Sequence, residues 1–171
     1  MKCHPKMMIK PLHLVIFFCL SVASITFFAP LVKADQQASA QFSLNDLHGV
    51  KHNLSNYKGK WVLVNYWATW CPPCLEEVPD LISLYENRRK KDVMVIGVVF
   101  DYENLKEVTD YVDDMLMTYP IVLSDNAVTT QFESVSVLPT TFIFNPQGKL
   151  IKTKHGIITK QYIEKMIGPD S

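Results

Sequence analysis

The fold is decided by residues 61–74, which read WVLVNYWATWCPPC. Residues 61–67 are short, β-branched and aromatic, and this composition predicts a buried strand. Beyond the cysteines, apolar residues recur at helical spacing over residues 75–85. The other face is mostly occupied by charged residues, which are Glu76, Glu77, Asp80, Glu86, Arg88 and Arg89. The stretch therefore predicts a strand that runs directly into a helix, with Cys71 at the junction and Cys74 one turn further in.

Cys71 and Cys74 are the only cysteines of the folded part, because Cys3 and Cys19 lie in an N-terminal targeting segment. A disulfide that served as a staple would close a longer loop, which constrains the unfolded chain more. At a helix N-terminus, unpaired N–H groups and the helix dipole stabilise a thiolate, the attacking form in disulfide exchange. We therefore predict that Cys71 is the nucleophile and that Cys74 attacks the resulting mixed disulfide to release the product.

Other interpretations of the cysteine pair stay open from the residues alone. One is a structural disulfide without turnover. Another is half of a zinc site, although only His48, His52 and His155 are left to complete it. A third is a copper-carrying domain of related fold, although such domains usually space their cysteines differently and add a histidine. His155 itself is better interpreted as an ordinary strand-end residue than as a ligand.

The remaining elements are predicted from apolar periodicity and turn chemistry. A β-hairpin precedes the central strand, and a strand, a helix, a strand, a second hairpin and a last helix follow the cysteine helix. We expect the first hairpin at residues 42–44 and 50–54, the next strand at 93–100, the helix at 105–116 and the following strand at 121–123. The second hairpin is expected at residues 140–144 and 150–154, and the last helix after its cap, Thr159. This order predicts an α/β fold with a mixed sheet.

The N-terminus predicts export. Three lysines precede an apolar run at residues 12–32 that contains no carboxylate. A signal-peptidase cut is favoured before Asp35, after short or small side chains at the −3 and −1 positions. The alternative for residues 1–34 is an uncleaved membrane anchor, since the run is long enough to cross a bilayer. In either case the domain is exported, with residues 35–41 as a linker and residues 42–171 as one domain.

Composition excludes some function classes. The formal net charge is zero over 171 residues, but residues 1–34 hold four lysines and no acid, which leaves 13 of the 17 basic residues against all 17 acidic ones. This slightly acidic domain has no nucleic-acid surface pattern. It is long enough to bury a core without cross-links.

Several motifs together resemble the TlpA/ResA-like branch of the thioredoxin superfamily. They are NYWATWCPPC at residues 65–74, Glu77 and Pro79, LPTTF at residues 138–142, and the later glycines Gly148 and Gly156. The resemblance covers nearly everything from Phe42 onward. It implies a thioredoxin fold, with a central mixed sheet flanked by helices, an N-terminal β-hairpin, and a central strand–helix insert between residues 93 and 139. Residues 101–103, at the start of the insert, are interpreted as solvent-facing rather than cleft-lining.

The resemblance also assigns roles to single residues. It implies that Pro139 is a cis-proline facing the cysteine pair, and that Leu138 offers backbone hydrogen bonds to an extended substrate. Trp70 and Pro72 flank the pair, where we expect them to keep it at the surface, and they complete the candidate substrate-binding set. Pro79 matches a helix-interior proline of structural role.

Glu77 is the third candidate catalytic residue, after Cys71 and Cys74. Many thioredoxins hold a buried aspartate on the strand before the cysteines to accept a proton from the second thiol, but the matching residue here is Asn65, which cannot act as a base. In the ResA-like group a glutamate three residues after the second cysteine lies near the pair. The resemblance therefore implies that Glu77 tunes Cys74 and relays its proton. A solvated glutamate on the helix face is the alternative.

The function implied by the resemblance is a reductase that keeps selected exported cysteines reduced, as family members do for apocytochrome c. A membrane thiol reductant carrier would supply its electrons, because the compartment is oxidising; no cofactor or metal is expected. The same chemistry in reverse makes an oxidase or isomerase, since direction depends on the reduction potential. A copper-binding chaperone is a third candidate. A peroxidase is disfavoured, because Ala68 stands where the peroxide-activating pattern has threonine.

Overall fold

A computed structural model of the chain describes residues 41–168, apart from 126–127, 129–130 and 133. The predicted export segment, residues 1–34, and residues 35–40 of the linker lie outside the described residues. In the described part, no helix is both long and apolar enough to span a bilayer.

The centre of the domain is a five-stranded mixed sheet in the order β5-β4-β3-β6-β7. The strands are β3 (Trp61–Trp67), β4 (Val93–Val99), β5 (Ile121–Leu123), β6 (Thr140–Phe144) and β7 (Leu150–His155). β3 pairs with β4 in parallel and with β6 antiparallel, β5 extends the parallel side, and β7 the antiparallel side. Every residue of β4, and every residue of β3 after the first, is buried, which explains their apolar and β-branched composition.

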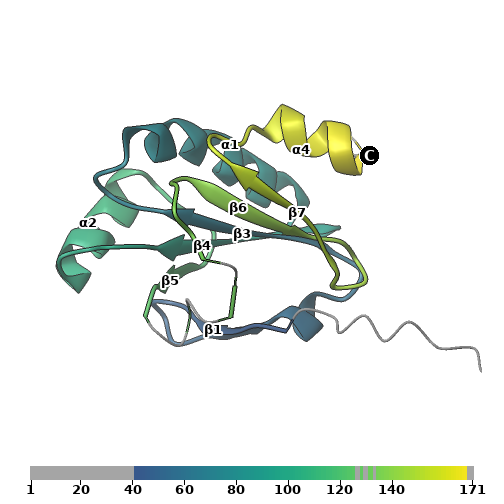
Figure 1. The fold of residues 1–171 in the computed structure, drawn as a ribbon, viewed down its shortest axis with the longest axis horizontal. Coiled ribbons are helices and arrows are strands. Elements are labelled where there is room, and N and C mark those ends of the chain that lie inside the picture. Colours follow the sequence, from purple (N-terminus) through teal and green to yellow (C-terminus); the bar gives the residue numbers. More distant parts are fainter. Residues whose placement is uncertain (1–40, 126–127, 129–130, 133, 169–171) are drawn as a thin grey trace, which may run out of the picture. The chain divides into compact units, whose positions relative to one another are not determined.

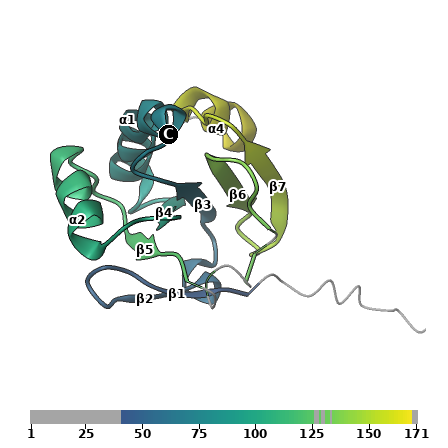
Figure 2. The same ribbon diagram turned by 60° about the vertical axis from the view of Figure 1, so that its left-hand side comes forward.

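Three helices flank this sheet in the described residues: α1 (Pro72–Arg88), α2 (Leu105–Asp114) and α4 (Lys160–Ile167). Figure 2 shows α1 and α4 over one face and α2 near the side formed by β4 and β5. The predicted cap of the last helix is confirmed, because Thr159 Oγ1 accepts the Tyr162 N–H at 3.1 Å. Asn104 caps α2 in the same way, accepting the Glu107 N–H at 3.0 Å.

The predicted N-terminal hairpin is also present. Its strands β1 (Ser43–Asn45) and β2 (Lys51–Asn53) form a separate two-stranded sheet, followed by the short 3-10 helix η1 (Leu54–Tyr57). The Leu47 N–H donates to the Ile121 carbonyl at 2.8 Å and so attaches the hairpin turn to β5. In Figures 1 and 2 the hairpin lies on the side of the sheet away from α1 and α4. An aromatic cluster forms the core there: Phe42, Tyr66, Phe132, Phe142 and Phe144.

The architecture confirms the predicted mixed sheet, flanking helices, N-terminal hairpin and central insert. One part of the prediction for α1 is wrong. The helical pattern assigns Glu77 and Arg88 to the charged outer face, but these side chains are only 1% and 2% exposed. Arg88 pairs with Asp92 and donates from Nη1 to the Gly168 carbonyl at 2.7 Å. Its buried guanidinium group therefore links the C-terminal end of α1 to the C-terminal end of α4 by a hydrogen bond.

Candidate active site

Cys71 and Cys74 form a disulfide at the start of α1, with 5.3 Å between their Cα atoms. Cys71 is the N-cap residue of the helix and Cys74 lies in its first turn. β3 ends four residues before Cys71, so the central strand leads into α1 with Cys71 at the junction, as the sequence predicts. The pair is less superficial than expected from its flanking residues, since Cys71 is 4% exposed and Cys74 is 0% exposed.

The start of α1 offers fewer N–H donors to Cys71 than a helix N-terminus normally does. Pro72 and Pro73 are its first two residues and carry no N–H group. The first N–H of the helix, that of Cys74, donates to the Cys71 carbonyl at 3.0 Å. The expectation that several unpaired N–H groups surround Cys71 is therefore not met. Of the two effects expected to stabilise its thiolate, only the helix dipole remains.

A groove of about 310 Å³ reaches Cys71 from the surface. It is lined by Trp70, Cys71, Pro72, Pro73, Phe100, Val135, Ser136, Val137 and Leu138. Of the four predicted substrate-binding residues, Trp70, Pro72 and Leu138 line it, while Pro139 does not. The Leu138–Pro139 peptide bond is cis, as the resemblance implies. Among the described residues, the backbone of Leu138 takes part in no hydrogen bond.

Glu77 lies one turn after Cys74 with its carboxyl group buried in the protein. Its Oε1 accepts from Asn65 Nδ2 at 2.7 Å, and its Oε2 accepts from the Ile158 N–H at 2.8 Å. Burial raises the pKa of Glu77 from 4.5 to about 7, against the lowering effect of these two hydrogen bonds and of Lys154. The carboxyl group therefore changes its protonation near neutral pH, which is a property of general acids and bases.

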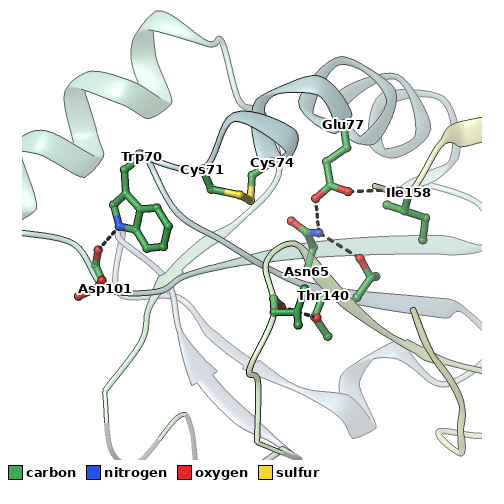
Figure 3. The surroundings of a disulfide bond; sticks show 10 residues. Asn65, Trp70, Cys71, Cys74, Glu77, Asp101, Thr140 and Ile158 are labelled. Atoms are coloured by element: carbon green, nitrogen blue, oxygen red, sulfur yellow. Dashed lines mark hydrogen bonds between the residues drawn. A yellow bond between two sulfur atoms is a disulfide. The ribbon is translucent and has the colours of Figure 1, made fainter. Parts of the chain in front are cut away.

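Asn65 holds this carboxyl group in place. From the middle of β3 its Nδ2 also donates to Thr141 Oγ1 at 3.0 Å, so one side chain joins α1 through Glu77 to β6. Figure 3 shows the Glu77 side chain pointing from α1 toward Asn65, beside the disulfide. In this disulfide-bonded form no hydrogen bond joins the carboxyl group of Glu77 to either sulfur among the described residues. The solvated alternative for Glu77 is excluded by its burial.

The contacts that hold Trp70 were not predicted from the sequence. The indole is 58% exposed, yet its Nε1 donates to the Asp101 carbonyl at 2.8 Å (Figure 3). The preceding residue, Thr69, donates its hydroxyl to Glu107 Oε1 in α2. Asp101 has a φ of 53° and is exposed, so its side chain faces solvent as expected, while its carbonyl binds Trp70. Tyr102 departs from that expectation, because it is partly buried and packs against the core. The pattern N-x-x-E at residues 104–107 is the one sequence signal that indicates Glu107, as a helix-start motif.

Elsewhere, the described residues contain no cluster of three or more His, Cys, Asp or Glu side chains suited to a metal ion. His155 lies at the end of β7, where its Nδ1 shares a hydrogen bond of 2.9 Å with Thr140 Oγ1.

A larger cavity of about 520 Å³ lies between the hairpin turn and the segment that joins α2 to β5. None of the predicted site residues lines it, so the smaller groove beside Cys71 is the one that the cysteine chemistry can use.

Comparison with known proteins agrees with this geometry. Residues 35–153 match the family model described as AhpC/TSA family. The chain is 34% identical over 122 residues to the thiol-disulfide oxidoreductase ResA of Bacillus subtilis, a match covering 71% of this chain and 68% of that protein. ResA of Geobacillus thermodenitrificans is 36% identical over 124 residues, covering 72% and 71%. The crystal structure of StoA from Bacillus subtilis superposes with a TM-score of 0.65 at 28% identity, covering 75% of this chain and 97% of that one.

Proposed function

Because this chain belongs to the AhpC/TSA family of thioredoxin-like proteins and is a thiol–disulfide oxidoreductase of the ResA type, we propose that it reduces protein disulfides outside the cytoplasm. The observation that carries the proposal is the Cys71–Cys74 pair, with Cys71 lining an apolar groove and the buried carboxyl group of Glu77 one turn after Cys74. This arrangement supplies a nucleophile, a resolving thiol and a proton acceptor in one place.

The proposed reaction begins with the dithiol form. The Cys71 thiolate attacks one sulfur of the substrate disulfide, so a Cys71–substrate disulfide forms and the first substrate sulfur leaves as a thiolate, which takes up a proton. Cys74, as a thiolate, then attacks Cys71 Sγ. The second substrate sulfur leaves, and the intramolecular disulfide seen in the structure is the product. Two electrons and two protons have passed from the protein to the substrate.

Glu77 is proposed to serve the second step. The Cys74 thiol is fully buried and must lose its proton before it can attack. A carboxylate whose pKa is raised to about 7 by burial is matched to accept that proton near neutral pH. Asn65 and the Ile158 N–H fix the orientation of the carboxylate, so that it does not rotate away between turnovers.

Substrate recognition is proposed to use the chain before the cis-proline. The backbone N–H and C=O groups of Leu138 are free of intramolecular hydrogen bonds among the described residues and can pair with an extended substrate strand. Trp70 and Pro72 line the same groove as Leu138. Pro139 is proposed to shape this segment rather than to line the groove.

The cellular setting completes the proposal. Residues 1–34 direct the domain across the membrane, with residues 12–32 either removed or kept as a tether. The substrates are exported proteins with cysteines, for example apocytochrome c, whose Cys-x-x-Cys-His site must be reduced before haem attachment. A membrane thiol carrier returns the protein to its dithiol form, because the compartment itself is oxidising.

The test is the reaction of the reduced protein with an oxidised peptide that carries a Cys-x-x-Cys-His sequence. We expect the peptide to be reduced stoichiometrically and the protein to end as the Cys71–Cys74 disulfide. Cys74→Ser is expected to accumulate the mixed disulfide, whereas Cys71→Ser gives no covalent product. A protein that leaves the peptide oxidised, or whose disulfide form oxidises the reduced peptide to completion, would overturn the proposed reductase.

A further inference from the structure

The described residues that line the groove beside Cys71 are apolar or cysteine, apart from one serine, and two of them, Trp70 and Val137, are large apolar side chains exposed to solvent. They are 58% and 50% exposed, while Phe100 and Leu138 are partly buried and pack against the core. At about 310 Å³ the groove lies at the lower limit of small-ligand pockets, large enough for a single side chain and far too small for a folded element. It opens where a substrate that pairs with Leu138 has to pass Cys71.

One wall of this groove is held by the insert rather than by the cysteine motif. The indole of Trp70 is anchored at its Nε1 by the Asp101 carbonyl, and the residue before it is anchored by its hydroxyl group to Glu107 in α2. Glu107 is itself fixed, because its Oε2 accepts the Glu103 N–H at 2.9 Å. The hydrogen bond from Thr69 is the main reason why the pKa of Glu107 is lowered, so this carboxylate is ionised at neutral pH.

We propose that Glu107 is a positioning residue that holds Trp70, through Thr69, as one wall of this groove, and that the groove takes a bulky apolar side chain next to the reacting cysteine of the substrate. The inference rests on the proposed function and adds a substrate class to it: polypeptides with a leucine-like or phenylalanine-like residue beside the cysteine. It places selectivity in α2 and the loop at residues 100–104, at a distance in sequence from the cysteines that carry out the exchange.

A charged side chain is disfavoured in the same place. Among the described residues that line the groove none is charged, so a substrate aspartate or lysine would lose water without gaining a partner from them. A glycine beside the substrate cysteine would leave the groove unfilled. Burial of a leucine-sized side chain is expected to raise kcat/KM at least about 10-fold over glycine.

The test uses symmetric peptide dimers, each joined by one disulfide and differing only in the residues beside the cysteine, which are leucine in one dimer and glycine in the other. Hydroxyethyl disulfide is the third substrate, since it has no side chain to fill the groove. The reduced wild-type protein is expected to prefer the leucine dimer at least about 10-fold in kcat/KM. In Glu107→Ala and Thr69→Val, which both remove the hydrogen bond between these residues, we expect this preference to fall to about 3-fold or less, with hydroxyethyl disulfide reduced at the wild-type rate within about 2-fold.

Two control variants separate positioning from general damage. Thr69→Ser keeps the hydroxyl group and is expected to keep the leucine preference. Glu103→Ala removes a carboxylate one turn away, from an exposed side chain that takes part in no hydrogen bond or ion pair among the described residues, and is expected to change nothing.

The possible results are distinguishable. Equal reduction of both dimers by the wild-type protein would overturn the groove assignment while leaving the proposed reductase intact. A preference that survives in Glu107→Ala, or a loss of hydroxyethyl disulfide reduction in that variant, would overturn the positioning role. Failure of the wild-type protein to reduce any of the three substrates would overturn the proposed function, and this inference with it.

Discussion

Glu77→Gln tests the buried carboxyl group through the pH dependence of stability. In the folded, oxidised protein burial raises the pKa of Glu77 from 4.5 to about 7, and in the unfolded chain the group returns to its ordinary value. A pKa that is raised on folding stabilises the protein below the unfolded value, and the contribution is lost as the pH rises through the folded value. Ionisation of Glu77 is therefore expected to weaken the wild-type protein progressively between about pH 4.5 and about pH 7.

The magnitude follows from the two pKa values. Each pKa unit corresponds to about 1.4 kcal/mol, so the change from 4.5 to about 7 costs the wild-type protein about 3 kcal/mol of unfolding free energy at alkaline pH. Glutamine cannot ionise and avoids this cost. It can accept only one of the two hydrogen bonds from Asn65 and Ile158, which subtracts about 1 kcal/mol at every pH.

The assay is urea unfolding of the oxidised wild-type, Glu77→Gln and Glu76→Gln proteins at several pH values between about 4 and about 8. We expect Glu77→Gln to be less stable than wild type at the acidic end and more stable at the alkaline end, with the difference moving by about 3 kcal/mol between them. Glu76 is exposed on the same helix, so its variant is expected to follow the wild-type curve. Parallel curves for wild type and Glu77→Gln would refute the raised pKa.

The same variant bears on catalysis. If ionised Glu77 accepts the Cys74 proton, the wild-type rate of disulfide reduction rises with pH through about 7. Glu77→Gln is expected to be slower and to lack this inflection while remaining folded. An unchanged pH–rate profile would remove Glu77 from the proposed mechanism and leave it a structural residue.

Three further predictions concern the fold and the leader. Gly97→Ala is expected to destabilise the protein by about 1–3 kcal/mol in thermal unfolding, because the added Cβ would lie 2.9 Å from Ile121 Cδ1 and 3.0 Å from the Trp67 ring; a stabilised variant would contradict this packing. Arg88→Leu removes the hydrogen bond to the end of α4 and is expected to lower the free energy of unfolding by about 2 kcal/mol in urea. The same change at exposed Arg89 is expected to lower it by less than about 1 kcal/mol, and equal losses of stability in the two variants would argue against a stabilising role for the buried Arg88 contact. Mass spectrometry of the protein from cells is expected to find the N-terminus at Asp35, and an intact leader would show instead that residues 12–32 remain as an anchor.

The strand–helix junction was predictable because its signals are local. β3 is buried on both faces, so nearly every residue in it is apolar, and the prolines after Cys71 stand where a helix start tolerates them. The turns and caps, such as Thr159, are likewise set by one or two residues. The predicted and observed positions of these features agree to within one or two residues.

The buried charges were not predictable from periodicity. Glu77 and Arg88 carry side chains that a helical pattern assigns to solvent, and each is buried only because distant groups supply its partners: Asn65 and Ile158 in one case, Gly168 in the other. The resemblance to a known family indicated Glu77. No such signal existed for Arg88.

The anchoring of Trp70 escaped prediction for a different reason. Its partner is the carbonyl of Asp101, a group that every residue possesses, presented by a backbone with a φ of 53°. The second contact joins Thr69 to Glu107 across 38 residues, and periodicity carries no information about a pair so far apart. Only the folded chain brings α2 against the cysteine loop.

The direction of electron flow is tested most directly by the reduction potential of the Cys71–Cys74 pair, measured at equilibrium with a dithiothreitol or glutathione buffer. A reductase is expected to have a potential near that of thioredoxin, about −270 mV. A value near that of a strong oxidant such as DsbA, about −120 mV, would contradict the proposed reductase and assign the pair to disulfide formation.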